Sequence, residues 1–211
     1  EEEILAAARK LASGKAPGLD GIPPEAIKWA VDENPERAAS LMTSLLEEGT
    51  YPTSWKRARL VLIPKGTANE QAQAYRPLCM LDTAGKLYEQ VLVARIRKEL
   101  ETGEDLADMQ FGFRPGRSAE TALSKLDEIV REVKGVSHTN RKLCALVTFD
   151  VKNAFNTAPW GAIIRELQRR RVSPYLVRAV CAFLRGRVVQ VGERDVQMTC
   201  GVPQGSVLGP V

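Results

Sequence analysis

The feature that most constrains this sequence is a run of mostly apolar residues, 143–149 (LCALVTF), which is closed by Asp150. A short apolar run between polar segments is typical of a buried β-strand. A carboxylate at the end of such a strand is costly to bury unless its charge is compensated. A bound Mg²⁺ ion can compensate the charge, because this cation prefers hard oxygen ligands. We therefore expect a central strand over residues 142–150 with Asp150 at its end as a metal ligand. Taken alone, Asp150 is better explained as a residue that caps the following turn.

Composition and charge are those of an ordinary globular protein and exclude few functions. Of the 211 residues, 44% are hydrophobic and 27% are charged, which is enough apolar material for a sizeable core. The net charge of +4 is compatible with nucleic-acid binding but is also common in unrelated proteins. No apolar segment approaches the roughly 20 residues of a membrane span. Four scattered cysteines and a single histidine argue against a structural zinc site.

Apolar spacing, prolines and glycines predict many helices and few strands. Helical patterns occur at residues 4–12, 24–29, 41–46, 82–101, 118–133, 159–167 and 173–184. Besides the run at 142–150, we expect a short strand at 59–63 and a hairpin at 187–200 that turns at 192–195. Helices in runs, with few strands, indicate the α+β class rather than a regular βαβ alternation.

Five sequence blocks follow one another along the chain, and each by itself has an ordinary explanation as a loop or turn. They are residues 14–23 (GKAPGLDGIP), 62–65 with 74–78 (LIPK and AYRPL), 110–118 (QFGFRPGRS), 148–155 (TFDVKNAF) and 201–206 (GVPQGS). In this order they resemble the blocks of reverse transcriptases. The sequence motifs of the second and third blocks are similar to those of the enzymes from non-LTR (LINE-like) retrotransposons.

The resemblance implies a right-hand polymerase of the α+β class, with helical fingers over residues 1–140 and the first part of the palm, with a small antiparallel sheet, over 141–211. It also implies an RNA-directed DNA polymerase, in which a primer 3′-OH attacks the α-phosphate of a dNTP while two Mg²⁺ ions stabilise the attacking and leaving oxygens. The partners implied are an RNA template, a DNA primer or target-site DNA, and dNTPs, with no membrane. Such a protein is expected inside the cell, in a cytoplasmic ribonucleoprotein and in the nucleus.

The resemblance assigns roles around the metal ions and the nucleotide. The family residue that matches Asp150 binds both metal ions, and the one that matches Val151 offers its backbone carbonyl to one of them. The aromatic residue that matches Phe155 packs under the sugar and blocks a 2′-OH, although a core aromatic is a strong competing explanation. The residues that match Gln204 and Gly205 lie against the incoming nucleotide and template, and a glycine permits close approach to its backbone.

Basic residues complete the site that the resemblance implies. The residues that match Lys65 and Arg76 reach from the fingers to the triphosphate, whose oxygens need cationic partners during transfer. Phe113, Arg114 and Arg117 belong to the block near the template, and such side chains suit base stacking and phosphate contact. Lysine and arginine side chains lie by default at the surface in contact with water. For Arg114 and Arg117, a rigid turn is about as good an explanation as contact with the template.

The sequence departs from the family after its last block. Relatives carry further aspartates in an aromatic-x-Asp-Asp hairpin after the Gln-Gly pair, and this chain ends six residues after Gly205. Glu193 and Asp195 precede the block and do not match those aspartates. Because the chain also lacks an initiator Met and ends in an apolar run, we expect a piece of a longer polyprotein that is inactive by itself.

Two alternatives remain open at the level of sequence. A non-catalytic nucleic-acid-binding remnant of a decayed or domesticated element would keep the basic blocks and lose the chemistry. An RNA-dependent RNA polymerase would share the strand that ends in an aspartate. Such enzymes generally carry a second aspartate where this sequence has Phe155, which favours deoxynucleotides here.

Overall fold

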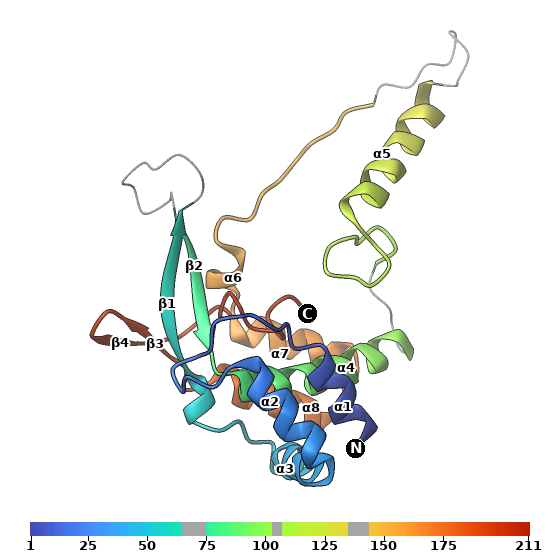
Figure 1. The fold of residues 1–211 in the computed structure, drawn as a ribbon. Coiled ribbons are helices and arrows are strands. Elements are labelled where there is room, and N and C mark those ends of the chain that lie inside the picture. The colour runs from blue at the N-terminus through green and yellow to red at the C-terminus, as the bar shows by residue number, and fades with distance from the viewer. Residues whose placement is uncertain (65–74, 103–106, 135–143) are drawn as a thin grey trace. The chain divides into compact units, whose positions relative to one another are not determined.

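The computed structural model describes residues 1–64, 75–102, 107–134 and 144–211, and it confirms the α+β class (Figure 1). The chain forms two compact units. One combines Glu1–Glu104 with Asn153–Val211, and the other is Asp105–Lys152. The bounds of these units differ from the expected division at residue 140, so the assignment of fingers and palm remains a prediction.

The larger unit is mostly helical and is centred on α4 (Thr83–Thr102). Its Tyr88, Leu92 and Ile96 side chains are almost completely buried. The other helical elements described in this unit are α1 (Glu2–Arg9), α2 (Pro24–Glu33), α3 (Pro35–Glu48), the 3₁₀ turn η1 (Ser54–Lys56), α6 (Ala154–Thr157), α7 (Trp160–Arg169) and α8 (Pro174–Leu184). Helix α4 contacts α1, α2 and α8, so it links the first and last thirds of the chain.

Several helix boundaries lie at prolines and glycines, of which Pro24, Pro174 and Gly49 were predicted to mark boundaries and Pro35 was not. Pro24, Pro35 and Pro174 each occupy the first turn of a helix, where the missing N–H costs nothing. Helix α3 ends at Gly49, which has φ 64° and whose N–H reaches back to the carbonyls of the last turn. Among the helices that the structure describes, none is long and apolar enough to cross a membrane.

The strands that the structure describes form a four-stranded sheet in the order β2-β1-β3-β4. The strands are β1 (Arg57–Pro64), β2 (Tyr75–Leu81), β3 (Val188–Val191) and β4 (Arg194–Gln197). The predicted strand at 59–63 and the hairpin at 187–200 are confirmed, with the hairpin strands shorter than expected. We expected an antiparallel sheet, but β1 and β3 pair in parallel while the other two pairings are antiparallel.

Strand β2 was not predicted, because Pro77 lies within it and polar residues precede it. Proline cannot donate to a ladder hydrogen bond, and it is tolerated in strands at the edge of a sheet. The strand order makes β2 such an edge strand, paired only with β1 among the described strands. Figure 1 shows β1 and β2 as a long hairpin that extends away from the helices of its own unit.

The smaller unit contains α5 (Ala119–Lys134), preceded by a loop over residues 107–118. As predicted, Ser118 precedes this helix, and its Oγ accepts a hydrogen bond from the Thr121 N–H at 3.3 Å. Residues 144–152 complete the described part of this unit.

The predicted strand at 142–150 is absent from the described part of that segment. Residues 144–150 are assigned to no strand, and residues 142 and 143 lie outside the described residues. A strand is stabilised by a hydrogen-bonded neighbour and by burial of its apolar face. Within the described residues no strand pairs with this segment, and its Val147, Phe149 and Cys144 side chains are exposed.

Candidate active site

The block at residues 201–206 forms a turn that is attached to the edge strand β2. The carbonyl of Gln204 accepts a hydrogen bond from the Cys79 N–H at 2.7 Å. Gly205 has φ 115°, and a Cβ at this position would lie 2.7 Å from the Cys79 carbonyl oxygen. Only glycine adopts this backbone geometry without strain, and only glycine fits so close to the strand. The local packing therefore accounts for the glycine, while its exposed outer side leaves the backbone open to a ligand.

The beginning of the same block is attached to the segment that joins α6 to α7. The Val202 N–H donates to the carbonyl of Phe155 at 2.7 Å, and the Gly201 N–H donates to that of Ala158 at 2.8 Å. The Gly201 carbonyl in turn accepts from the Trp160 Nε1 at 2.7 Å. The Phe155 ring is partly buried and packs against the hydrophobic core. Its position next to Val202 brings the fourth sequence block against the fifth.

Arg76 lies on the strand that holds the Gln204–Gly205 turn. Side chains two residues apart share one face of a strand, so Arg76 and Leu78 point to the same side of β2. Leu78 contacts the turn, since its Cδ1 is 3.1 Å from the position of a Cβ on Gly205. Arg76 is exposed, and it is three residues, or about 10 Å, from the Cys79 amide along the strand. The structure therefore brings Arg76, Phe155 and the turn to one region of the larger unit, whereas Lys65 lies outside the described residues.

A buried glutamate lies beneath the far end of this turn, and sequence reasoning missed it. Glu89 on α4 is fully buried, and its Oε2 accepts the N–H groups of Val207 at 2.7 Å and Leu208 at 2.9 Å. Its Oε1 accepts the Tyr51 hydroxyl at 3.3 Å. Burial raises the pKa of Glu89, against the lowering effect of the Arg187 charge and the two amides. The signal was present in the sequence, because Glu89 interrupts the apolar face that continues at Leu92 and beyond.

Arg187 is the second buried charged group of this region. Its guanidinium carbon lies 3.9 Å from the centre of the Phe183 ring and 5.2 Å from that of Tyr51, which are cation–π distances. Its Nε donates to the Phe183 carbonyl. Neither Nη atom has a hydrogen-bond partner among the described residues. The burial of Arg187 is thus stabilised mainly by two aromatic faces and by the nearby charge of Glu89.

The predicted template residues lie in the loop of the smaller unit. Arg114 Nη1 donates to the Ala107 carbonyl at 3.1 Å, and Arg117 Nη1 donates to that of Asp108 at 2.6 Å. Arg117 also stacks on Phe111 at 5.0 Å. These contacts show that both arginines bind backbone carbonyls of their own loop, whereas the alternative to template contact was a rigid turn with solvated arginines. Phe113 is largely exposed with φ 57°, so it presents a ring that a base could stack on.

Asp150 and Val151 are exposed in the smaller unit. The residues that the structure describes include no group of three or more His, Cys, Asp or Glu side chains placed to hold a metal ion. Two-metal catalysis requires several carboxylates around both ions. The described residues by themselves therefore do not fit a two-metal centre, and the role of Asp150 as a metal ligand remains a prediction.

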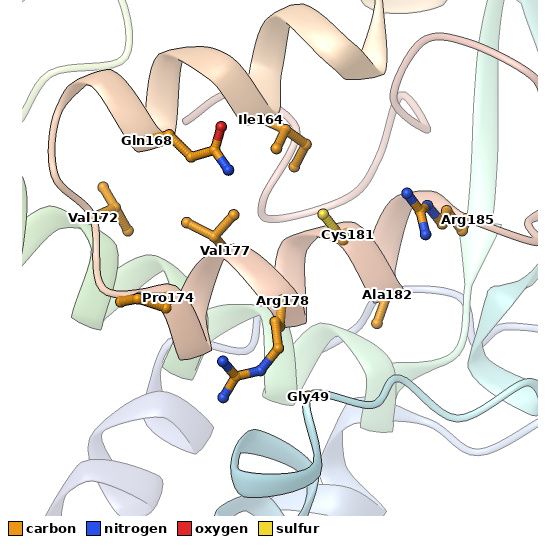
Figure 2. Close-up of a pocket in the computed structure, with 10 residues that line it drawn as sticks. All are labelled: Gly49, Ile164, Gln168, Val172, Pro174, Val177, Arg178, Cys181, Ala182 and Arg185. Atoms are coloured by element: carbon orange, nitrogen blue, oxygen red, sulfur yellow. The ribbon is translucent and has the colours of Figure 1, made fainter.

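A hollow of about 690 Å³ lies between α7 and α8 (Figure 2). Its apolar lining includes Ile164, Val177 and Cys181, and Arg178 of α8 and Arg185, which follows that helix, contribute to its wall. None of the residues predicted to bind nucleotide or template lines this hollow. It is therefore a feature separate from the candidate active site.

Comparison with known proteins agrees with the blocks and the fold. Residues 63–211 match the family described as reverse transcriptase (RNA-dependent DNA polymerase). This is more than half of the chain, and the chain belongs to that family. As a family, reverse transcriptases generally use divalent cations.

The individual relatives are proteins of transposable elements. The chain is 33% identical to a 115 kDa protein in the type-1 retrotransposable element R1DM of Drosophila melanogaster. It is 28% identical both to the RNA-directed DNA polymerase from mobile element jockey of that species and to the retrovirus-related Pol polyprotein from type-1 retrotransposable element R1 of Bradysia coprophila. These alignments cover 99% of this chain and 20%, 23% and 20% of the relatives, respectively. The predicted family is confirmed, and the chain spans about a fifth of the length of these relatives.

Proposed function

We propose that this chain is the nucleotide- and template-facing part of the RNA-directed DNA polymerase of a non-LTR retrotransposon. Its substrates are dNTPs, a primer 3′-OH and an RNA template, and the primer is DNA, including target-site DNA. The same proposal places the protein inside the cell, in a cytoplasmic ribonucleoprotein and in the nucleus. The family match and the relatives named RNA-directed DNA polymerases support it.

The observation that carries the proposal is the meeting of three separate sequence blocks in one compact unit. The backbone of the Gln204–Gly205 turn is hydrogen-bonded to Cys79, and the neighbouring Val202 is hydrogen-bonded to Phe155. Chain segments near residues 78, 155 and 204 therefore form one surface. A nucleotide site needs this combination of an open backbone, a planar apolar side chain and a cation.

Each side chain on this surface has a distinct proposed role. Arg76 offers a planar guanidinium to triphosphate oxygens, to which it can bind in a bidentate manner. The exposed backbone at Gly205 lies against the base or sugar of the incoming nucleotide. The Phe155 ring contacts the sugar and disfavours a 2′-OH. We also propose Lys65 as a second cation for the triphosphate, and Phe113, Arg114 and Arg117 as contacts to the template strand.

The family's use of divalent cations is part of the same proposal. Mg²⁺ is the proposed ion, with the Asp150 carboxylate and the Val151 carbonyl as two of its ligands. The described residues do not form a metal cluster by themselves, so the remaining ligands of such a site have to come from elsewhere in the polymerase.

Primer extension by the polymerase that contains this chain tests the function. With Mg²⁺, oligo-dT primer and poly-rA template, we expect incorporation of dTTP, and little incorporation of UTP. Preferential use of UTP would identify an RNA-synthesising polymerase. RNA binding that weakens steeply with salt, without incorporation of either nucleotide, would identify a non-catalytic nucleic-acid-binding protein.

A further inference from the structure

Glu89 occupies a position where a charged side chain requires an explanation. It lies on the core-facing side of α4 and is fully buried, and the residues that follow it on the same face, Leu92 and Ile96, are apolar and buried. An ionisable group in such a place is destabilising unless its hydrogen bonds and its charge are both satisfied. An apolar residue would fill the same volume at a lower cost. The contacts of Glu89 therefore indicate what the carboxylate is for.

Those contacts are to backbone groups that follow the candidate nucleotide-binding turn. One oxygen, Oε2, accepts two consecutive N–H groups, from Val207 and Leu208. These residues come two and three positions after Gly205. Gln204 is held on the other side by its bond to Cys79, at 2.7 Å. The turn is consequently fixed between an edge strand and the side chain of a core helix.

The positive charge of Arg187 acts on Glu89 and opposes the rise in pKa that burial causes. Arg187 lies over the Tyr51 and Phe183 rings, and its two Nη atoms make no hydrogen bonds within the described part of the chain. The Tyr51 hydroxyl donates to the other oxygen of Glu89. Tyr51 thus contacts both charged groups, which are buried, and Glu89 connects them to the amides of residues 207 and 208.

We propose that Glu89 is a positioning residue that holds the Gln204–Gly205 turn in the geometry that binds the incoming deoxynucleotide, with Arg187 stabilising its charge. Glu89 touches no substrate, and it acts through the Val207 and Leu208 amides. This inference rests on the proposed function, because it assigns a cause to the shape of the proposed nucleotide site.

The test compares three substitutions of Glu89 in the full polymerase. Glu89→Ala removes the acceptor, and Glu89→Asp keeps the charge but shortens the side chain so that it no longer reaches the amides. Glu89→Gln keeps an oxygen that can accept both amides and an NH₂ group that can donate to the Tyr51 oxygen. We expect the first two to raise the KM for dTTP at least about tenfold, with a smaller change in kcat, and Glu89→Gln to stay within about threefold of wild type.

Glu99 provides a matched control on the same helix. Its carboxylate accepts the Ser173 N–H and hydroxyl, both at 2.7 Å, so it also anchors backbone to α4, but at the beginning of α8. Glu99→Ala should leave the KM for dTTP unchanged. A purely structural role for Glu89 predicts instead that all variants lose active enzyme, with lower apparent kcat and the same KM, and this result would overturn the proposal.

Amide hydrogen exchange gives a readout that does not depend on activity. In Glu89→Ala or Glu89→Asp, whichever folds, the amides of residues 207 and 208 should exchange at least about tenfold faster than in wild type, and in Glu99→Ala they should not. Unchanged exchange at these two amides would overturn the inference even if the polymerase is active. If exchange is faster in the Glu89 variants as expected, but the wild type does not extend a primer, the proposed function is refuted. The anchoring role of Glu89 would still stand.

Discussion

Residues 201–208 and 144–151 both carry predicted site residues and apolar side chains, yet their surroundings in the structure differ completely. Residues 201–208 are attached to β2, to the α6–α7 connection and to Glu89, and Val202 and Leu208 are buried. Residues 144–151 have no strand partner in the described structure, and Phe149 is 92% exposed. The comparison teaches that an apolar run predicts a capacity for burial, whereas burial itself depends on a partner surface.

The difference also bears on the two parts of the candidate site. The nucleotide-facing turn has its geometry fixed by hydrogen bonds within its own unit. The segment that carries Asp150 has no such bonds in the described residues that would fix the carboxylate. A catalytic constellation must be held to within a fraction of an ångström. We therefore expect the turn to be preformed and the Asp150 segment to depend on further contacts for its final geometry.

The largest expected effect is on catalysis, through Asp150 in the region that has no strand partner among the described residues. In the complete polymerase, Asp150→Asn should lower kcat/KM for dTTP by more than about a hundredfold, or about 2.7 kcal/mol of barrier. The reason is that the substitution removes a negative ligand without changing the size of the side chain. Primer extension measures it, with Asp127→Asn on α5 as the control. A loss of less than tenfold would mean that Asp150 only caps its turn.

The second prediction concerns stability and directly tests the difference in burial between residues 201–208 and residues 144–151. Leu208→Ala should lower the free energy of unfolding of the chain by about 2–4 kcal/mol, because it removes a buried side chain and leaves a cavity. Phe149→Ser should change it by less than about 0.5 kcal/mol, because the ring is already exposed. Urea unfolding followed by circular dichroism measures both. Equal losses at the two positions would show that residues 144–151 are buried in solution.

A smaller effect on stability is expected at the turn itself. Gly205→Ala should cost about 1–3 kcal/mol through its positive φ, and more if the Cβ cannot avoid the Cys79 carbonyl. Gly192 is a matched control, because it also has a positive φ, of 61°, but no atom lies within 4 Å of an added Cβ. If the two alanine variants unfold at the same urea concentration, the close approach to β2 contributes nothing.

The smallest expected effect is on sugar selectivity. In the complete polymerase, Phe155→Val should raise the kcat/KM for UTP relative to dTTP by about tenfold, since discrimination depends on differential binding in the transition state. Leu176→Ala is the control, because that side chain is fully buried in the core and lies outside the proposed nucleotide surface. Single-nucleotide incorporation measures the ratio. Equal loss of both rates in Phe155→Val would make Phe155 a core residue only.

Much of the helical architecture could be predicted, because its signals are local. Pro24 and Pro174 start helices, Gly49 ends one, and apolar spacing marks the faces that pack. The α+β class followed from these elements. Strand β2 could not be predicted in the same way, since Pro77 is tolerated only because the strand lies at the edge of the sheet, which is a property of the whole fold.

The site shows the same division between local and non-local information. Gln204 and Gly205 could be selected from the sequence by their motif. The sequence did not show that Gly205 packs against Cys79. It likewise identified the block at residues 14–23 without showing that a Cβ on Gly18 would collide with Asp82. Glu89 was missed although a charged residue on an apolar helix face was visible, because the two amides that it binds are distant in sequence. The metal and template assignments remain predictions from family resemblance.

The parallel pairing of β1 with β3 has a consequence for how the chain folds as it is synthesised. Arg57 pairs with Val188, and its guanidinium also binds the Asp195 carboxylate at 2.7 Å. At roughly 5–20 residues per second, the ribosome adds the later strand on the order of ten seconds after the earlier one. Until then one edge of β1, within a hairpin that carries exposed Leu62 and Ile63, has no partner. The nascent chain therefore presents an open strand edge, and binding by a chaperone in this interval would prevent misassociation between neighbouring nascent chains.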